Sequence, residues 1–212
     1  MIFFNRREGL KQEKSRAKRW DKFKAETSNL ILESARYLFA TKGFTKTTIR
    51  EIATHAEIGL GTIYKHYKNK NSLLAAAMYD DLTSLFHEAK SSIPQDVLIL
   101  DQLIHFAGFY YRYYTSKPEL SREYLTHIVF VEGEWEKKFE LFEKDYARQI
   151  NELIDAAKER GEVSNDKDSH LMTMSFIANY FLVLMEFFIR RKSKDPDKML
   201  EYLKKLIALS VC

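Results

Sequence analysis

The sequence predicts an all-α protein with a small N-terminal helical domain and a larger helical domain behind it. Two observations predict this fold class. Apolar residues recur every three or four positions through most of the 212 residues, which is the spacing of one face of a helix. No segment shows the alternation of apolar and polar residues that a half-buried strand requires. We therefore expect about nine helices and no sheet.

The first element is expected to be a basic extension over residues 1–25, which has no periodic apolar face. Helical character is expected there only toward Trp20 and Phe23. A core helix then runs from Thr27 to Lys42. Gly43 ends that helix, because glycine adopts the left-handed conformation of a helix C-terminus at little cost.

Two short helices around a tight turn are expected next. Thr48 caps the first, because Glu51 stands three residues later and the two can form a capping box. Ala53 is small enough to let the helices cross closely around the turn at 56–59, whose glycine caps the second helix. Ile63 anchors that second helix inward. Its outward side chains are Leu60, Thr62, Tyr64, Lys65 and His66.

The larger domain begins with a helix capped by Asn69 that runs to about Ser91, before a break at Pro94. Pro118 suits the first turn of a helix, and Gly161 ends another. The remaining helices are expected over residues 95–115, 118–132, 134–160, 166–192 and 196–211.

The longest apolar stretch, Met172 to Ile189, approaches the roughly 18 to 20 residues needed to span a bilayer. Glu186 and three other polar residues interrupt it, and an acidic residue inside a membrane is costly. A helix buried on nearly all sides by its own domain and by a partner subunit explains the stretch better. No membrane association is expected.

Charge is unevenly distributed along the chain. Residues 1–70 hold sixteen Lys or Arg against seven Asp or Glu, whereas residues 71–212 hold eighteen against twenty-three. A basic first third on a mildly acidic body indicates a polyanion as partner of that third. The alternative for residues 1–25 is a solvated arm whose lysines and arginines only aid solubility.

The only cysteine, Cys212, cannot form an internal disulfide, and a reducing cytoplasm is the expected compartment. The first four residues are too short an apolar run for a signal peptide. No nucleophile elbow, phosphate-binding glycine loop or Cys and His cluster is present, and His87-Glu88 lies on an exposed helical face. We therefore expect no catalytic residues, no cofactor and no metal site.

The two short helices and their flanks form a long spaced pattern. Its residues are Ile31, Ala35, Leu38, Phe39, Gly43, Phe44, Thr48, Ile52, Ala53, Gly61, Thr62, Ile63, Tyr64, His66, Tyr67 and Lys70. This pattern resembles the DNA-binding domain of TetR-family transcriptional regulators, and the resemblance covers about a third of the chain, from about Leu30 to about Leu82. Two positions depart from the family pattern: Glu57 stands where the family usually has Gly, and Gly59 where it usually has Ser.

The resemblance implies a helix-turn-helix DNA-binding domain at 26–72 and a helical ligand-binding and dimerisation domain at 73–212. The second short helix would enter the major groove of double-stranded DNA, with Arg50 the best candidate for a guanine contact. The base-facing set would be Arg50, Leu60, Gly61, Thr62 and Lys65. The set that holds the DNA backbone would be Thr48, Tyr64, His66, Tyr67 and Lys70. Packing in the core is the alternative for Tyr64, Tyr67 and His66.

One such helix contacts too few phosphates for tight specific binding, so we expect a homodimer on a palindromic operator. The resemblance implies that the last two helices pair with their twins as a four-helix bundle. The all-round apolar character of 176–189 and the apolar stripe at 199–207 agree with this arrangement.

The body is rich in aromatic residues, and in the family such helices enclose a pocket whose small-molecule effector changes the spacing of the two DNA-reading heads. An apolar or aromatic effector would then release a repressor from its operator, with His105, Arg112 or Asn179 as further polar anchors. The candidate ligand-binding residues are Phe106, Phe109, Tyr110, Tyr113, His127 and Phe142. The alternative for these aromatics is an ordinary core. The alternative function is a DNA-binding protein of the same fold with no small-molecule gate, either architectural or controlled by a protein partner.

Overall fold

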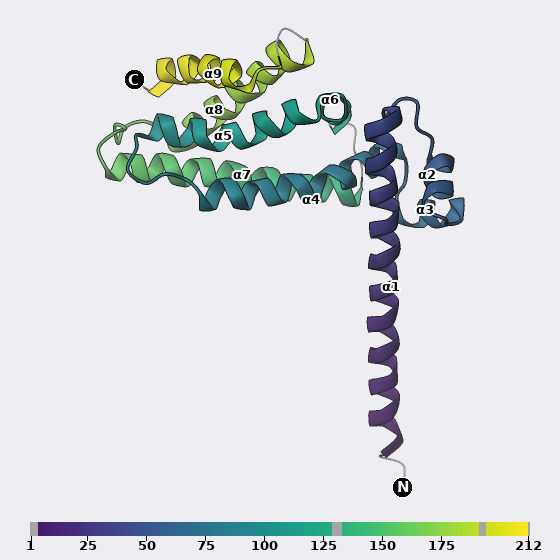
Figure 1. The fold of residues 1–212 in the computed structure, drawn as a ribbon. Helices are drawn as coiled ribbons and strands as arrows, with labels where there is room; N and C mark the ends of the chain where they lie inside the picture. Colours follow the sequence, from purple (N-terminus) through teal and green to yellow (C-terminus); the bar gives the residue numbers. More distant parts are fainter. Residues whose placement is uncertain (1–3, 129–132, 191–193, 212) are drawn as a thin grey trace. The chain divides into compact units, whose positions relative to one another are not determined.

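The computed structural model describes residues 4–128, 133–190 and 194–211, and these residues form nine α-helices, one π-helical segment and no strand. The all-α expectation is confirmed. The chain divides into two compact units, residues 1–73 and residues 74–212. Figure 1 shows the helices in chain order.

The first unit contains α1 (Phe4–Lys42), α2 (Ile49–His55) and α3 (Leu60–His66). Figure 1 shows α1 as one long helix with α2 and α3 beside its C-terminal part. The expected start of this helix at Thr27 is wrong, because the basic extension continues the same helix. Lys, Arg, Glu and Gln have high helix propensity, and adding a residue to an existing helix is far easier than nucleating one.

The core of the first unit forms where α2 packs on α1 and on α3. Gly43 has φ +86°, so α1 ends in the left-handed turn that the sequence predicts. The ring of Phe44 then lies edge-on to Phe39, with centroids 5.1 Å apart. The buried apolar side chains include Ile31, Ala35, Phe39, Phe44, Ile52, Ala53, Ile63 and Tyr67.

Helix α4 (Lys70–Ser91) starts in the first unit and continues into the second. As predicted, Asn69 caps it, since its Oδ1 accepts from the Ser72 amide at 2.8 Å. The second unit continues with α5 (Ile99–Ser116), α6 (Pro118–His127), α7 (Glu134–Glu159), α8 (Ser169–Val183), η2 (Leu184–Ile189) and α9 (Pro196–Val211).

Several helix ends in the second unit differ from the expectation. Helix α5 begins at Ile99 rather than residue 95, because the Ile99 amide donates to the Glu162 carboxylate at 2.7 Å. Helix α8 begins at Ser169 because the Asp168 carboxylate accepts from the amides of His170 and Leu171. Helix α6 ends at His127, and the rest of its expected range, 129–132, lies outside the described residues, as does the expected end of α8 beyond residue 190.

The long apolar stretch becomes α8 and the wider π-helical turns of η2. Among the described residues, Ser169–Phe187 is long and apolar enough to cross a bilayer, and only 28% of that window is buried inside the chain. Helix α8 packs on α7 and α9, and α9 packs on α5 (Figure 1). The expected burial on nearly all sides is therefore not provided by a single chain. The large apolar side chains left exposed on α8, η2 and α9 are Leu171, Met174, Phe181, Leu182, Met185 and Tyr202.

Candidate nucleic-acid interface and ligand cavity

The first turn of α2 is held by the capping box that the sequence predicts. Thr48 Oγ1 accepts from the Glu51 amide at 3.2 Å, and Glu51 Oε2 accepts from the Thr48 amide at 2.8 Å. The Lys42 ammonium contacts the same carboxylate, and together with the Thr48 donors it lowers the pKa of Glu51 to about 2. Arg50 lies within this fixed turn with its side chain exposed. The cap therefore sets the direction in which Arg50 is presented.

The turn between α2 and α3 adopts a conformation that usually requires glycine. Glu57 has φ +55°, the one positive φ at a non-glycine position in the described part of the chain. The turn is closed by the Ile58 amide, which donates to the Ala53 carbonyl at 3.0 Å. Gly59 then caps α3 as expected, in an extended conformation and without a side-chain hydrogen bond. The turn geometry is thus kept although Glu57 departs from the family pattern.

Helix α3 presents one outward face. Ile63 is fully buried and anchors the helix, whereas Tyr64 is 53% exposed. Gly61 and Lys65 are exposed, and Leu60 and Thr62 are partly exposed. This set includes the residues that the sequence assigns to base contacts on α3.

His66 stands at the C-terminal end of α3 and is partly buried. Partial burial lowers the pKa of His66, and the positive charge of Lys24 on α1 lowers it further by a smaller amount. The ring is therefore mainly neutral at pH 7, which weakens it as a partner for phosphate. Lys24 also shows that the α1 extension brings positive charge to this end of α3. The sequence indicated that charge, but not its position.

Two residues expected to hold the DNA backbone have internal roles instead. Tyr67 is 3% exposed, and its hydroxyl lies 2.7 Å from Ser28 Oγ on α1. Lys70 Nζ donates to the carbonyls of Phe44 at 2.9 Å and Thr47 at 3.1 Å, and it lies 4.2 Å from the centre of the Phe44 ring. These internal contacts make a DNA contact less favourable for both residues, which stays a prediction. The carbonyls meet Lys70 only because the chain folds back on itself, which no local pattern reveals.

The second unit contains a cavity of about 420 Å³ between α5, α6, α7 and α8. Half of its lining residues are aromatic, and Tyr110 and Phe142 of the expected ligand-binding set are among them. Met174 and Ile177 of α8 also contribute. The aromatic lining residues are Tyr110, Tyr114, Tyr124, Phe139, Phe142, Tyr146, Tyr180 and Phe181.

Two phenol groups in the cavity wall are buried without a hydrogen-bond partner among the described residues. They belong to Tyr110, which is 2% exposed, and Tyr146, which is 9% exposed, and their rings lie 5.4 Å apart. Burial raises the pKa of both groups, so both hydroxyls stay protonated at neutral pH. The neighbouring Tyr111, by contrast, donates to the Tyr180 carbonyl at 2.9 Å.

The other four expected ligand-binding residues do not line the cavity. Phe106 is fully buried and packs on Phe86 and Tyr146, and Phe109 lies against the His105 ring. Tyr113 donates to Asp81 at 2.8 Å, and His127 Nδ1 lies 2.8 Å from the Glu123 carbonyl oxygen. Helix α5 is aromatic on several faces, so sequence spacing could not tell which face meets the cavity. Phe106 is a core residue, which was the alternative interpretation of these aromatic side chains.

The expected polar anchors also lie elsewhere. Arg112 Nη2 is 3.6 Å from Asp197 Oδ1, and His105 Nε2 is 3.0 Å from Ser92 Oγ. Asn179 lines a second, smaller cavity of about 280 Å³. The charged residues at the 420 Å³ cavity are instead Glu140, Glu143 and Lys144, which the sequence did not single out.

The sequence profile described as bacterial regulatory proteins, tetR family, matches residues 31–77, which hold the C-terminal part of α1, α2, α3 and the start of α4. Residues 31–77 therefore form a TetR-family DNA-binding domain. With this domain, and in agreement with its curated relatives, the chain is a helix-turn-helix transcriptional regulator and not an enzyme.

Similarity extends well beyond the matched domain. The chain is 24% identical over 190 residues to the uncharacterized HTH-type transcriptional regulator YvkB of Bacillus subtilis, covering 83% of this chain and 92% of YvkB. It superposes with a TM-score of 0.67 and 21% identity on Thermus thermophilus FadR, a TetR-family transcriptional repressor in complex with lauroyl-CoA, covering 86% and 92% of the two chains. It superposes with a TM-score of 0.65 and 16% identity on a putative transcriptional regulator from Saccharomonospora viridis in complex with choline, covering 87% and 96%. At these identities the two solved structures establish the common fold.

Proposed function

We propose that this TetR-family regulator is a cytoplasmic homodimer that represses transcription from a near-palindromic operator and is released by a small ligand. The observation that carries the proposal is the exposed outer face of α3, held by the buried Ile63 and by the turn at Glu57. Helices presented in this way enter the major groove of duplex DNA.

On this proposal the bases are read by Arg50 from α2 and by the exposed residues of α3. The guanidinium fork of Arg50 can address O6 and N7 of one guanine, and Thr62 and Lys65 lie on the face that enters the groove. Thr48, Tyr64 and His66 remain the candidates for backbone contacts. Tyr67 and Lys70 leave that set because their polar groups are engaged inside the first unit. The base-facing set is Arg50, Leu60, Gly61, Thr62 and Lys65.

The apolar side chains on α8, η2 and α9 support an isologous dimer. Phe181, Leu182 and Met185 are 45–50% exposed and come from the last turn of α8 and the following turn of η2. A soluble monomer rarely leaves such a contiguous apolar surface open to water. A twofold interface would bury the same surface of both copies and present two α3 helices to two half-sites. It would also account for the apolar α8 without a membrane.

The cavity between α5 and α8 supports the ligand gate. Its volume of about 420 Å³ lies in the range of roughly 300–1,000 Å³ typical of small-molecule sites. A related fold, Thermus thermophilus FadR, is a repressor solved with lauroyl-CoA. A ligand releases DNA only when it binds the DNA-incompetent state more tightly than the competent one.

The experiment is selection of bound genomic fragments, followed by titration of the recovered site and of a scrambled duplex at physiological ionic strength. We expect one near-palindromic site, a stoichiometry of two chains per site, and release by at least one compound that occupies the cavity. Equal affinity for both duplexes, or a chain that stays monomeric on DNA, would contradict the proposal. Specific binding that no cavity ligand relieves would instead favour the same fold without a small-molecule gate.

A further inference from the structure

We propose that the cavity between α5 and α8 takes an organic cation with a bulky apolar or aromatic body. This inference rests on the ligand gate proposed above, and it names the chemistry of the ligand. It is carried by three features of the cavity: the aromatic rings of its wall, the charged residues at its mouth, and the small number of basic groups.

The wall offers rings from all four surrounding helices. Tyr110 and Tyr114 come from α5, Tyr146 from α7 and Tyr180 from α8, and α6 adds Tyr124. The ring centroid of Tyr146 lies 5.4 Å from that of Tyr110 and 6.2 Å from that of Tyr180. The face of an aromatic ring carries negative charge density and attracts a cation within about 6 Å of its centre. Several rings around one space therefore favour a positively charged guest.

The charged groups at the mouth are two carboxylates and one ammonium. Lys144 Nζ donates to Glu140 Oε1 at 2.6 Å, so the positive charge is paired. Glu143 stands beside this pair and adds a further negative charge. Loss of solvent is the larger cause of the raised pKa of Glu143, and repulsion from the neighbouring Glu140 carboxylate adds to it. A bound cation would compensate this charge.

The same features disfavour an anionic ligand. Lys144 is the one basic residue among the described residues that line the cavity, and its ammonium is paired with Glu140. Among the described residues that line the cavity, the phosphates of an acyl-CoA or the carboxylate of a fatty acid would meet Glu143 and no unpaired ammonium. The lining of this chain therefore points away from the lauroyl-CoA that the Thermus thermophilus repressor holds.

The test compares two ions of nearly the same shape and opposite charge, tetraphenylphosphonium and tetraphenylborate. Binding of each to the full-length protein is measured by isothermal titration calorimetry, with lauroyl-CoA as a third probe. We expect tetraphenylphosphonium to bind at least about tenfold more tightly than tetraphenylborate. Removing one negative charge in Glu143→Gln should reduce this preference several-fold.

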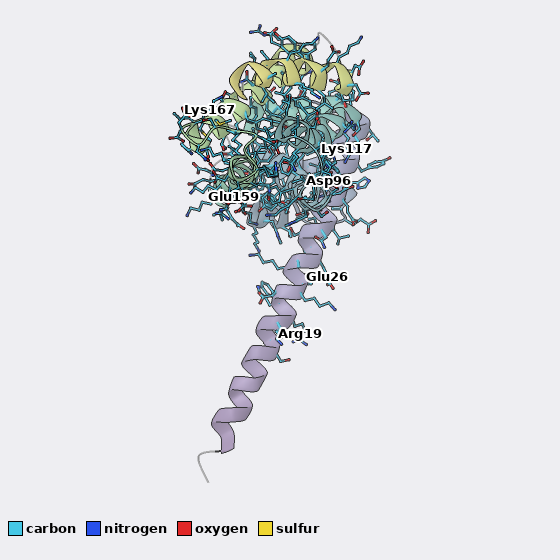
Figure 2. The ribbon with its side chains drawn as sticks, turned by 90° about the vertical axis from the view of Figure 1, so that its left-hand side faces the viewer. Arg19, Glu26, Asp96, Lys117, Glu159 and Lys167 are labelled. Atoms are coloured by element: carbon cyan, nitrogen blue, oxygen red, sulfur yellow. The ribbon has the colours of Figure 1, made fainter. Side chains whose placement is uncertain are left out.

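Glu159→Gln is the matched control, because Glu159 is an exposed glutamate on the same helix α7 and does not line the cavity (Figure 2). It should leave the preference unchanged. Equal or tighter binding of tetraphenylborate or lauroyl-CoA would overturn the proposal, as would a Glu143→Gln protein with unchanged preference.

Operator release is measured separately with the same probes. Charge-selective binding that fails to release DNA would support the ligand class and contradict the ligand gate. Release by tetraphenylphosphonium, and not by tetraphenylborate at equal concentration, would support both.

Discussion

At the residue scale, single side chains in this regulator have roles that depend on what surrounds them. Thr48 and Glu51 behave as their spacing predicts, because a capping box is closed within four residues. Tyr67 and Lys70 stand in a pattern that implies DNA contacts, yet their polar groups bond to Ser28 and to loop carbonyls. The difference lies in the sequence separation of the bonded residues. A local pattern predicts hydrogen bonds between residues within one turn, but it does not predict hydrogen bonds between residues that are distant in sequence.

Glu57→Gly should stabilise the first unit. Glu57 has φ +55°, and a residue with a Cβ atom in the left-handed region is strained by roughly 1–2 kcal/mol. Glycine removes this strain, but the greater flexibility of glycine in the unfolded state offsets part of the gain in stability. We expect the free energy of unfolding to rise by about 0.5–1 kcal/mol, measured by urea denaturation. Glu57→Ala removes the same charge and keeps the strain. If alanine stabilised the protein as much as glycine, strain would not be the cause.

Arg50→Ala should impair DNA binding, whereas Lys70→Ala should impair stability. Loss of the exposed Arg50 should weaken operator binding by about 1–3 kcal/mol and relax the preference at one base step. Loss of Lys70 removes hydrogen bonds to the carbonyls of Phe44 and Thr47, so it should lower the melting temperature.

Titrations at several salt concentrations distinguish the two variants from a simple loss of charge. For folded Lys70→Ala we expect the salt dependence of DNA binding to stay as in the parent protein. If the salt slope fell by about one unit and the melting temperature stayed unchanged, Lys70 would instead be a phosphate contact.

The neighbouring tyrosines Tyr110 and Tyr111 form a matched pair for a test of buried hydroxyls. Tyr110→Phe removes a hydroxyl that has no partner among the described residues, so stability should be unchanged or increased. Tyr111→Phe removes the donor to the Tyr180 carbonyl and should cost about 1–1.5 kcal/mol. Thermal unfolding of the two variants checks this order. The reverse order would show that Tyr110 is satisfied within the wall.

At the scale of elements, the sequence predicts the helices well, but it predicts their ends only where local residues set them. Gly43 and Asn69 act where local chemistry predicts. Helix α5 starts late because its first amide meets Glu162, which is distant in sequence. Helix α1 starts early because a helix nucleated by packing propagates through residues of high propensity without an apolar face. Its exposed Trp20 and Phe23, and the labelled Arg19 in Figure 2, lie on this extension.

Deleting residues 1–24 should weaken DNA binding and reduce its salt dependence. The deleted part of α1 carries a net positive charge, and Lys24 lies close enough to His66 to lower its pKa. Each lost phosphate contact lowers the salt slope by about 0.9 units on B-DNA. Fluorescence anisotropy with the operator at several salt concentrations measures this. Unchanged affinity and slope would leave residues 1–25 as a solvated arm.

At the scale of the whole molecule, the proposed function depends on surfaces that one chain leaves incomplete. Two base-reading helices require two copies of the chain, and α8 and η2 expose large apolar side chains. The cavity, by contrast, is formed within one chain by α5, α6, α7 and α8.

Leu182→Asp should convert the proposed dimer into monomers and abolish tight operator binding. Leu182 is 45% exposed on α8 and does not line the cavity, so a charge there would oppose an apolar interface and leave the site intact. Light scattering coupled to gel filtration measures the molar mass. Leu98→Asp is the control, because Leu98 is 64% exposed outside these elements and should leave the dimer unchanged. A dimeric Leu182→Asp protein would place the interface elsewhere.

The amino-acid sequence by itself determined the helical fold class, the capping box at Thr48, the stop at Gly43 and the resemblance to the TetR family, because each depends on residues within a few turns of one another. Only the tertiary structure decided that Tyr67 and Lys70 form hydrogen bonds within the first unit and that Tyr110 and Phe142, but not Tyr113 or His127, meet the cavity. The physical reason is that helical spacing specifies which face of a helix a residue occupies, whereas the packing of distant helices decides what that face contacts.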